Sequence, residues 1–263
     1  MLKEIIKNNK TLKKIFLWIM RNIFPIFKIS SVFNFYKIFY FFIDFLNFNR
    51  HGGDAKFINF YPCLSDRTKT SSIDFHYFYQ SIWAFNRIML FKKQNHIDIG
   101  SDVRFVGMLT NITSVKFVDI RPLKIDLKNF TGLDSSILNL PFKSNSIISI
   151  SCLHVIEHIG LGRYGDPIDP YGPLKASMEL QRVLKKNGRL FLSTPIGESI
   201  TQFNSQRIFS FQDIVSMFNN LRLIEVSVVD KSGRYIENID ISTFKFDENT
   251  GQDAGLGLFI FEK

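Results

Sequence analysis

The sequence has little cysteine, since Cys63 and Cys152 are the only two among 263 residues. Two thiols so far apart do not build a disulfide framework, and Cys152 lies in an apolar run that is typical of a buried thiol. A reducing compartment, the cytoplasm, is therefore expected. No small-residue cleavage site comes after the apolar stretch that ends before Arg21, so a secretory leader is not expected.

Long uncharged apolar runs are also missing. The most aromatic stretch, residues 29–48, is interrupted by Lys37 and Asp44, whereas a membrane-spanning helix needs about 20 predominantly apolar residues. The sequence therefore predicts a segment that lies on a membrane surface, or that packs against the main domain or a second subunit.

Acidic residues are scarce near the N-terminus. Residues 1–50 hold nine Lys or Arg against Glu4 and Asp44, so seven of the nine net positive charges fall there. The nearly neutral remainder argues against nucleic acid as a partner, because nucleic-acid binding needs a basic face on the folded domain. Residues 1–50 are predicted to form a basic, aromatic, amphipathic helical extension, with a helix over 2–23 that ends near Pro25. Membrane-surface association and packing against protein remain alternatives for it.

A loop-rich linker is expected at 51–73, and a domain at 74–263. In that domain, apolar runs of strand length alternate with helical patterns, and the alternation predicts an α/β fold with a mostly parallel sheet. Expected helices cover residues 73–90, 173–187 and 210–220. Two final strands, 222–230 and 255–263, complete the sheet. The sequence does not indicate an oligomeric state.

Glycine is sparse where a nucleotide-binding loop would be rich in it. The predicted strand 96–100 ends at Asp98 and Gly100, followed by Ser101 and Asp102 rather than by the glycines of G-x-G-x-x-G. Asp119 ends the next apolar strand, 21 residues after Asp98, where an acid can hold both hydroxyls of a ribose. The pair predicts one site for a nucleoside-containing cofactor.

His154, Glu157 and His158 spell H-x-x-E-H, which is also the signature of a class of zinc peptidases. The preceding run is β-rich, so we expect His154 at a strand end and the other two in the next turn. The two histidines then share no helix face, and a metal site is not expected. Tyr171 and Lys175 have the spacing of a short-chain dehydrogenase pair, but Pro173 between them puts Tyr171 outside the helix.

Longer stretches carry a resemblance. The order of the Asp98 and Asp119 strands, the "LPF" turn at 140–142, the strand ending near H-x-x-E-H and the "RVL" helix resembles class I S-adenosylmethionine-dependent methyltransferases. More narrowly, "DIRPL", "EHIGLGRYGDPIDPYG" and "FNSQRIFS" are similar to a methyltransferase-like family encoded among bacterial surface-polysaccharide genes. The resemblance covers residues 61–263. It implies a Rossmann-like sheet with an antiparallel last strand, and S-adenosylmethionine as cofactor.

The resemblance also implies residue roles. Asp98 and Gly100 would face the methionine part of the cofactor, Asp119 its ribose and Ser136 its adenine. Cys152 and Leu153 would line the amino-acid end of the cofactor through backbone groups.

For the acceptor, a general base is expected in the loop after the fourth strand. His158 is the first candidate, with Glu157 orienting it, although both could instead brace the loop. Candidate substrate-binding residues are Asp166, Asp169, Asn204 and Arg207.

The leading hypothesis is a methyltransferase that acts on a saccharide or lipid-linked saccharide in surface-polysaccharide biosynthesis, at the cytoplasmic face of the membrane. A catalytically inactive methyltransferase-fold binding protein, or another nucleotide-dependent α/β sugar enzyme, is the alternative.

Overall fold

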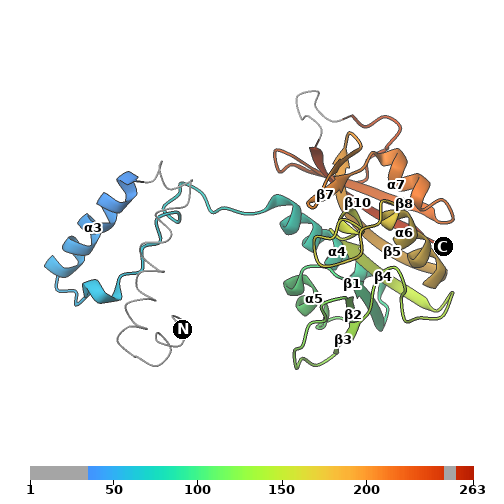
Figure 1. Ribbon diagram of the computed structural model, residues 1–263, viewed down its shortest axis with the longest axis horizontal. Helices are drawn as coiled ribbons and strands as arrows, with labels where there is room; N and C mark the ends of the chain where they lie inside the picture. The colour runs from blue at the N-terminus through green and yellow to red at the C-terminus, as the bar shows by residue number, and fades with distance from the viewer. Residues whose placement is uncertain (1–34, 246–252) are drawn as a thin grey trace. The chain divides into compact units, whose positions relative to one another are not determined.

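The computed structural model describes residues 35–245 and 253–263, and the chain divides into two units, Met1–Ser72 and Ile73–Lys263 (Figure 1). In unit 1, helix α3 (Phe35–Arg50) is followed by the 3-10 turn η3 (Phe57–Asn59). The Phe60 ring lies 4.9 Å from that of Phe41 and 4.7 Å from that of Phe45, centroid to centroid. Part of the stretch that the sequence suggested as a linker therefore packs against α3. The expected helix at 2–23 lies outside the described residues.

Unit 2 is built on one eight-stranded sheet with the order β3-β2-β1-β4-β5-β10-β8-β9. Neighbours from β3 to β5 pair in parallel, and β10 pairs antiparallel with both β5 and β8. This confirms the predicted Rossmann-like α/β fold with an antiparallel last strand. The strands are β1 (Asn95–Ile99), β2 (Ser114–Asp119), β3 (Phe130–Asp134), β4 (Ile147–Leu153), β5 (Leu184–Gly197), β8 (Arg222–Asp230), β9 (Tyr235–Ile236) and β10 (Asp253–Glu262).

Helix α4 (Phe75–Phe91) opens unit 2, where the sequence predicted a helix. The Asp74 carboxylate accepts hydrogen bonds from the backbone amides of His76 and Tyr77, which caps the first turn. Its buried face consists of Gln80, Trp83, Ala84 and Ile88, at helical spacing. The cap and this face fix the start of the helix beside the sheet.

Helices cover both faces of the sheet, as Figure 1 shows. Residues of α4 and of α5 (Val103–Leu109) belong to one apolar core, and residues of α6 (Gly172–Val183) and α7 (Phe211–Met217) to the other. Neighbours along β5 alternate between the two cores, with Phe191 in the first and Leu190 and Leu192 in the second.

Helix α6 ends earlier than the sequence suggested. The expected helix continued to residue 187, but Leu184 already pairs with Ile147 of β4, so the helix stops at Val183. Backbone pairing in the sheet outweighs the helical preference of "LKK". Sequence periodicity did not predict α5 or β3, which are short.

The topology creates the site. The chain passes from β1 to β2 on one side, while β4 pairs with the other side of β1, so the strand order reverses between β1 and β4. In open α/β sheets, ligands bind beyond the carboxyl ends of the strands at such a switch point.

A short hairpin of β6 (Ile200–Gln202) and β7 (Gln206–Ile208) comes after β5. In the described part of the chain, no helix has the length and apolarity needed to cross a membrane.

Candidate active site

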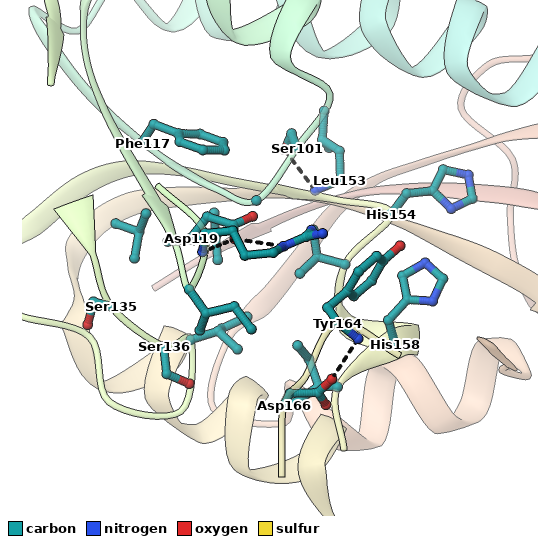
Figure 2. Close-up of a pocket in the computed structure, with 18 of the residues that line it drawn as sticks. Ser101, Phe117, Asp119, Ser135, Ser136, Leu153, His154, His158, Tyr164 and Asp166 are labelled. Atoms are coloured by element: carbon teal, nitrogen blue, oxygen red, sulfur yellow. Dashed lines mark hydrogen bonds and ion pairs between the residues drawn. The ribbon is translucent and has the colours of Figure 1, made fainter. Parts of the chain in front are cut away.

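A cavity of about 770 Å³ lies at the carboxyl ends of β1, β2 and β4. Its wall includes the β1–α5 turn, the end of β2, the turn after β3, the loop after β4 and Tyr77 of α4. Figure 2 shows Ser135 and Ser136 at one end, His154 and His158 at the other, and Asp119 between them. The cavity is therefore elongated along the edge of the sheet.

The β1–α5 turn is shaped by Asp98, although Asp98 itself does not line the cavity. Its carboxylate is fully buried, accepts a 3.0 Å hydrogen bond from the Ser101 backbone amide and accepts another from the Ser151 hydroxyl. The Ser101 hydroxyl in turn accepts from the Leu153 amide at 3.2 Å. Ser101 thus ties β1 to β4, which explains how a turn with a single glycine holds its shape. Asp98 positions the turn rather than facing the cavity.

Burial gives this aspartate unusual electrostatics. Desolvation raises the pKa of Asp98 to about 6, against the opposing hydrogen bonds from Ser151 and Ser101. His96 is equally buried, and desolvation lowers its pKa to about 3. Since Ser151 donates to Asp98, it accepts from Nε2–H of His96 (2.8 Å), and Nδ1 of His96 accepts from Ser149 (2.7 Å). With a neutral His96, each hydrogen bond in the series Ser149, His96, Ser151 and Asp98 has one donor and one acceptor.

Gly100 occupies the point where the turn meets Asp119. Its φ of +62° is left-handed, and a Cβ placed there would lie 3.4 Å from Asp119 Oδ2 and 3.4 Å from Val155 Cγ2. A side chain at this position would therefore narrow the space between β2 and β4. Gly100 and Asp119 both line the cavity, as predicted from their strand-end positions.

The Asp119 carboxylate ends β2 and faces the centre of the cavity. Its Oδ1 accepts a 2.7 Å hydrogen bond from the Arg121 amide, while within residues 35–245 and 253–263 no hydrogen bond to Oδ2 is found. Ser136 lines the same end beside Ile120, Ile137 and Leu138, but its hydroxyl accepts from the Leu138 amide. This end offers one available carboxylate oxygen next to an apolar wall.

The strand β4 ends in the sequence that resembles a zinc motif. Leu153 lines the cavity, whereas Cys152 lies behind it, fully buried, where desolvation raises the pKa of its thiol. His154 comes directly after β4 with a left-handed φ of +56°, a conformation that costs a non-glycine residue about 1 kcal/mol or more. Glu157 and His158 fall in the next 3-10 turn, η4 (Ile156–His158). Both placements agree with the prediction.

The buried Glu157 carboxylate serves both histidines. Nδ1–H of His154 donates to Glu157 Oε1 at 2.6 Å, and Nε2 of His158 lies 3.7 Å from the same oxygen. The His154 ring stacks on Tyr77 at 5.1 Å between centroids. Its Nε2 atom is buried and has no hydrogen-bond partner within the described residues. The His154 ring is thus held in place by Glu157 and Tyr77, whereas the His158 ring lies farther from the Glu157 carboxylate.

His158 has the protonation that a base needs. Its Nδ1 lies 2.7 Å from the Ser205 carbonyl, which can only accept, so Nδ1 carries the proton and Nε2 has the lone pair. Desolvation lowers the pKa of His158 more than Glu157 raises it. The imidazole is therefore neutral near pH 7. A proton taken up at Nε2 would be stabilised by Glu157.

The loop between η4 and α6 carries two of the predicted substrate residues. Asp166 lines the cavity, yet its carboxylate accepts from the Gly160 amide (2.7 Å) and the Tyr164 amide (3.3 Å). Asp169 lies outside the cavity wall and binds the Lys175 ammonium (2.7 Å) and the Tyr171 amide. Both carboxylates fold the loop, and only Asp166 is next to the cavity.

Asn204 and Arg207, the other two predicted substrate residues, do not line the cavity. Asn204 is a left-handed turn residue (φ +61°) between β6 and β7. Arg207 is buried and donates to the Ile159 carbonyl at 2.6 Å. Its desolvated guanidinium has a lowered pKa. In this arrangement both residues support the turn that holds His158.

Several cavity residues were not anticipated from the sequence, among them Tyr77, Arg121 and Tyr164. Tyr77 comes from α4, and Arg121 places its guanidinium carbon 4.3 Å from the centroid of the Tyr164 ring, at the distance of a cation–π contact. Arg121 comes after β2 and Tyr164 after η4, so this contact crosses the cavity; we refer to it as the Arg121–Tyr164 clasp. Arg121 lies in "DIRPL" and Tyr164 in "GRYGD", and only the fold brings the two residues together.

Within the described ranges, no cluster of three or more His, Cys, Asp or Glu residues is arranged to hold a metal ion.

Comparison with known proteins supports the fold. A protein family described as "Caenorhabditis protein of unknown function, DUF268" matches residues 143–252, less than half of the chain. A search of curated proteins finds no match. A proposed sarcosine dimethylglycine methyltransferase from Galdieria sulphuraria is 16% identical with a TM-score of 0.53, over 84% of this chain and 97% of that one. The N-methyltransferase NodS from Bradyrhizobium japonicum, solved with S-adenosylhomocysteine, is 12% identical with a TM-score of 0.48, over 76% and 92%.

Strand order, the position of the cavity and the Galdieria structure together define the class of fold. Unit 2 has the Rossmann-like fold of class I S-adenosylmethionine-dependent methyltransferases.

Proposed function

We propose that this protein is an S-adenosylmethionine-dependent methyltransferase whose acceptor is a saccharide hydroxyl. The observation that carries the proposal is the Asp119 carboxylate, which faces the cavity at the switch point with Oδ2 beside Gly100. An acid at the end of the second strand is suited to bind both hydroxyls of a ribose.

The residues present fit this cofactor. Asp119 would hold the ribose, and the apolar wall with Ile120 and Leu138 would cover the adenine, beside Ser136. Gly100 keeps the turn free of a Cβ at the closest approach. Leu153 and the turn held by Asp98 would enclose the amino-acid end. When bound, S-adenosylmethionine supplies an electrophilic methyl group for in-line displacement.

The residues at the other end supply the base. Neutral His158 would take the proton of the acceptor hydroxyl at Nε2 as the new carbon–oxygen bond forms. Its Nδ1–H stays bonded to the Ser205 carbonyl, which fixes the ring. Glu157, 3.7 Å from Nε2, would stabilise the resulting imidazolium. Positioning and exclusion of water provide the rest of the rate acceleration.

Two features favour a sugar as acceptor. Tyr77 and Tyr164 offer partly exposed rings at the His158 end of the cavity, and such amphipathic rings provide both apolar surface and a hydroxyl. The sequence stretches "DIRPL" and "EHIGLGRYGDPIDPYG", similar to a family of surface-polysaccharide genes, contribute Arg121, His158 and Tyr164 to this site. We therefore propose a role in surface-polysaccharide biosynthesis, with a cytoplasmic, peripheral enzyme acting on a saccharide or lipid-linked saccharide.

The first test is cofactor binding by the full chain. Calorimetry with S-adenosylhomocysteine should show binding, and Asp119→Ala should weaken it by about 100-fold or more, because two hydrogen bonds to a charged group, each worth about 1.5 kcal/mol or more, are lost. Asp134→Ala is the matched control, since Asp134 ends the neighbouring strand β3 but does not line the cavity. No binding by the wild-type protein would refute the assignment.

The second test is transfer. Isotope-labelled methyl groups from S-adenosylmethionine should appear on lipid-linked saccharides extracted from cells. Cofactor binding without transfer to any saccharide fraction would favour a catalytically inactive binding protein. Transfer to a lipid or protein fraction alone would refute the saccharide acceptor but retain the methyltransferase.

A further inference from the structure

Unit 1 presents an unusually apolar surface. Nine large apolar side chains of α3 and of residues 57–61 are 43% to 67% exposed. We call them the aromatic surface: Tyr36, Phe39, Tyr40, Phe42, Leu46, Phe48, Phe57, Ile58 and Tyr61. Scattered apolar side chains are normal on a protein surface, but a group of this size on about 26 residues marks a binding surface.

The aromatic surface has a packed base. Phe60 is 7% exposed, and its ring contacts those of Phe42 (5.8 Å) and Phe57 (4.8 Å) on either side. The Tyr36 ring contacts that of Tyr40 at 6.2 Å. Phe60 therefore connects α3 to the segment after it, and exposed apolar side chains lie on both sides of the turn at 51–53.

Positive charge accompanies this surface. Residues 1–72 hold twelve Lys or Arg against four Asp or Glu, which places eight of the nine net positive charges in unit 1. Asp44 is the only acid of α3, and Arg67 lies 3.3 Å from its carboxylate and 5.4 Å from the Tyr40 ring. The acid is thus paired, and among the described residues of unit 1, 35–72, five Lys or Arg stand against three Asp.

We propose that unit 1 binds the surface of an anionic membrane, with the aromatic surface inserted among the headgroups and acyl chains. A helix of 16 residues extends about 24 Å, shorter than a hydrocarbon core of about 30 Å. With Asp44 in its middle it is suited to lie in the interface. Aromatic side chains partition to that region, and lysine and arginine are attracted to anionic lipids.

A protein partner fits this composition less well. Protein interfaces are rich in aromatic residues, phenylalanine included, and in Arg, but they are depleted in Lys. Nine of the twelve basic residues of unit 1 are lysine, so the basic residues rather than the aromatic ones make the difference. A headgroup layer accepts both lysine and a phenylalanine-rich face. The inference rests on unit 1 alone and does not depend on methyl transfer in unit 2.

Co-sedimentation of the full chain with vesicles tests the proposal. We expect binding to phosphatidylcholine vesicles that contain about 30% phosphatidylglycerol, and at least tenfold weaker binding to pure phosphatidylcholine. Raising the salt from about 0.1 M to about 0.5 M should weaken binding to the anionic vesicles, because surface charges are screened.

Variants locate the surface. Phe39→Ser with Phe42→Ser should weaken anionic-vesicle binding about tenfold or more. The matched control, Leu174→Ser with Met178→Ser, removes two exposed apolar side chains from α6 of unit 2 and should leave binding unchanged. Because the Phe42 ring also contacts Phe60, the melting temperature of each variant is measured alongside. A loss of vesicle binding with an unchanged melting temperature assigns the effect to the surface.

Three outcomes would overturn the proposal. The wild-type chain could fail to bind anionic vesicles, the two pairs of variants could bind equally well, or Phe39→Ser with Phe42→Ser could dissociate a wild-type dimer without affecting vesicle binding. The last result would assign the aromatic surface to contact between two copies of the chain.

Discussion

The two units of this chain use the same residue types in opposite ways. In unit 2, the largest fully buried side chains include Trp83, Phe105 and Phe191, and charges nearly cancel. In unit 1, most described aromatic side chains are exposed and basic residues outnumber acids three to one. Buried aromatic residues therefore stabilise the core of unit 2, whereas most of the described aromatic residues of unit 1 remain available for binding. Four predictions test this difference, from the largest effect to the smallest.

Removing a core side chain from one unit should destabilise that unit and leave the other unchanged. Phe191→Ala removes a fully buried ring of β5 that contacts Trp83 and Phe91, and we expect the unfolding free energy of unit 2 to fall by about 3–5 kcal/mol. Phe60→Ala should increase exchange only in unit 1. Hydrogen exchange measures both, since each unit yields its own peptides. If either substitution increased hydrogen exchange equally in both units, the expectation that each unit has its own packed core would be wrong.

Loss of the base should reduce turnover and spare binding. His158→Gln keeps a donor for the Ser205 carbonyl but cannot take the proton from the substrate hydroxyl. We therefore expect kcat to fall about 100-fold or more. Affinity for S-adenosylhomocysteine should not change. His51→Gln in unit 1 serves as the control. In the wild-type enzyme, kcat should rise with pH through a His158 pKa below 6.5 and then level off; a flat profile would exclude this role.

The buried Asp98 should give unit 2 a pH dependence of its own. Its folded pKa of about 6 exceeds the unfolded value of about 3.9, so the folded state binds more protons between these values. Its contribution to stability is present below pH 4 and is lost as the pH rises to 6, by up to about 1.4 kcal/mol per pH unit.

Asp98→Asn should remove that contribution. The stability of the variant relative to wild type should rise from pH 4 to pH 6 and then stay constant in urea titrations. His96, with its lowered pKa, has the opposite dependence in both proteins and cancels in the comparison. A constant difference across the range would show that Asp98 does not titrate there.

The smallest effect concerns the Arg121–Tyr164 clasp. Arg121→Ala removes a cation–π contact at a partly exposed site, worth about 0.5–1 kcal/mol, together with the 3.7 Å ion pair between Arg121 and Asp119. We therefore expect S-adenosylhomocysteine to dissociate about two- to fivefold faster in stopped-flow measurements. Arg163→Ala is matched, because Arg163 lies 5.2 Å from the same ring but does not line the cavity. Equal rates for both variants would show that the clasp does not retain the ligand.

Much of the fold is set by local sequence. Alternating apolar runs predicted β1, β2, β4 and α4, and the strand-end positions of Gly100 and Asp119 predicted their place at the cavity. The family resemblance suggested Leu153 and Cys152 together, and only Leu153 lines the cavity. The substrate residues were harder to predict, because a polar loop residue looks the same whether it faces a ligand or the backbone. The Asp169 carboxylate accepts from the nearby Tyr171 amide, and the Arg207 guanidinium donates to the Ile159 carbonyl. Nothing in the spacing of either residue distinguishes these roles from ligand binding.

The sequence by itself determined the class of fold, the acidic strand ends and the cationic N-terminal region, because periodicity and charge are properties of neighbouring residues. Tertiary structure alone decided that Asp98 is buried behind the turn and that Tyr77, Arg121 and Tyr164 line one cavity. Those arrangements depend on which distant strands and helices pack together, since burial and contact across a sheet are set by the whole fold.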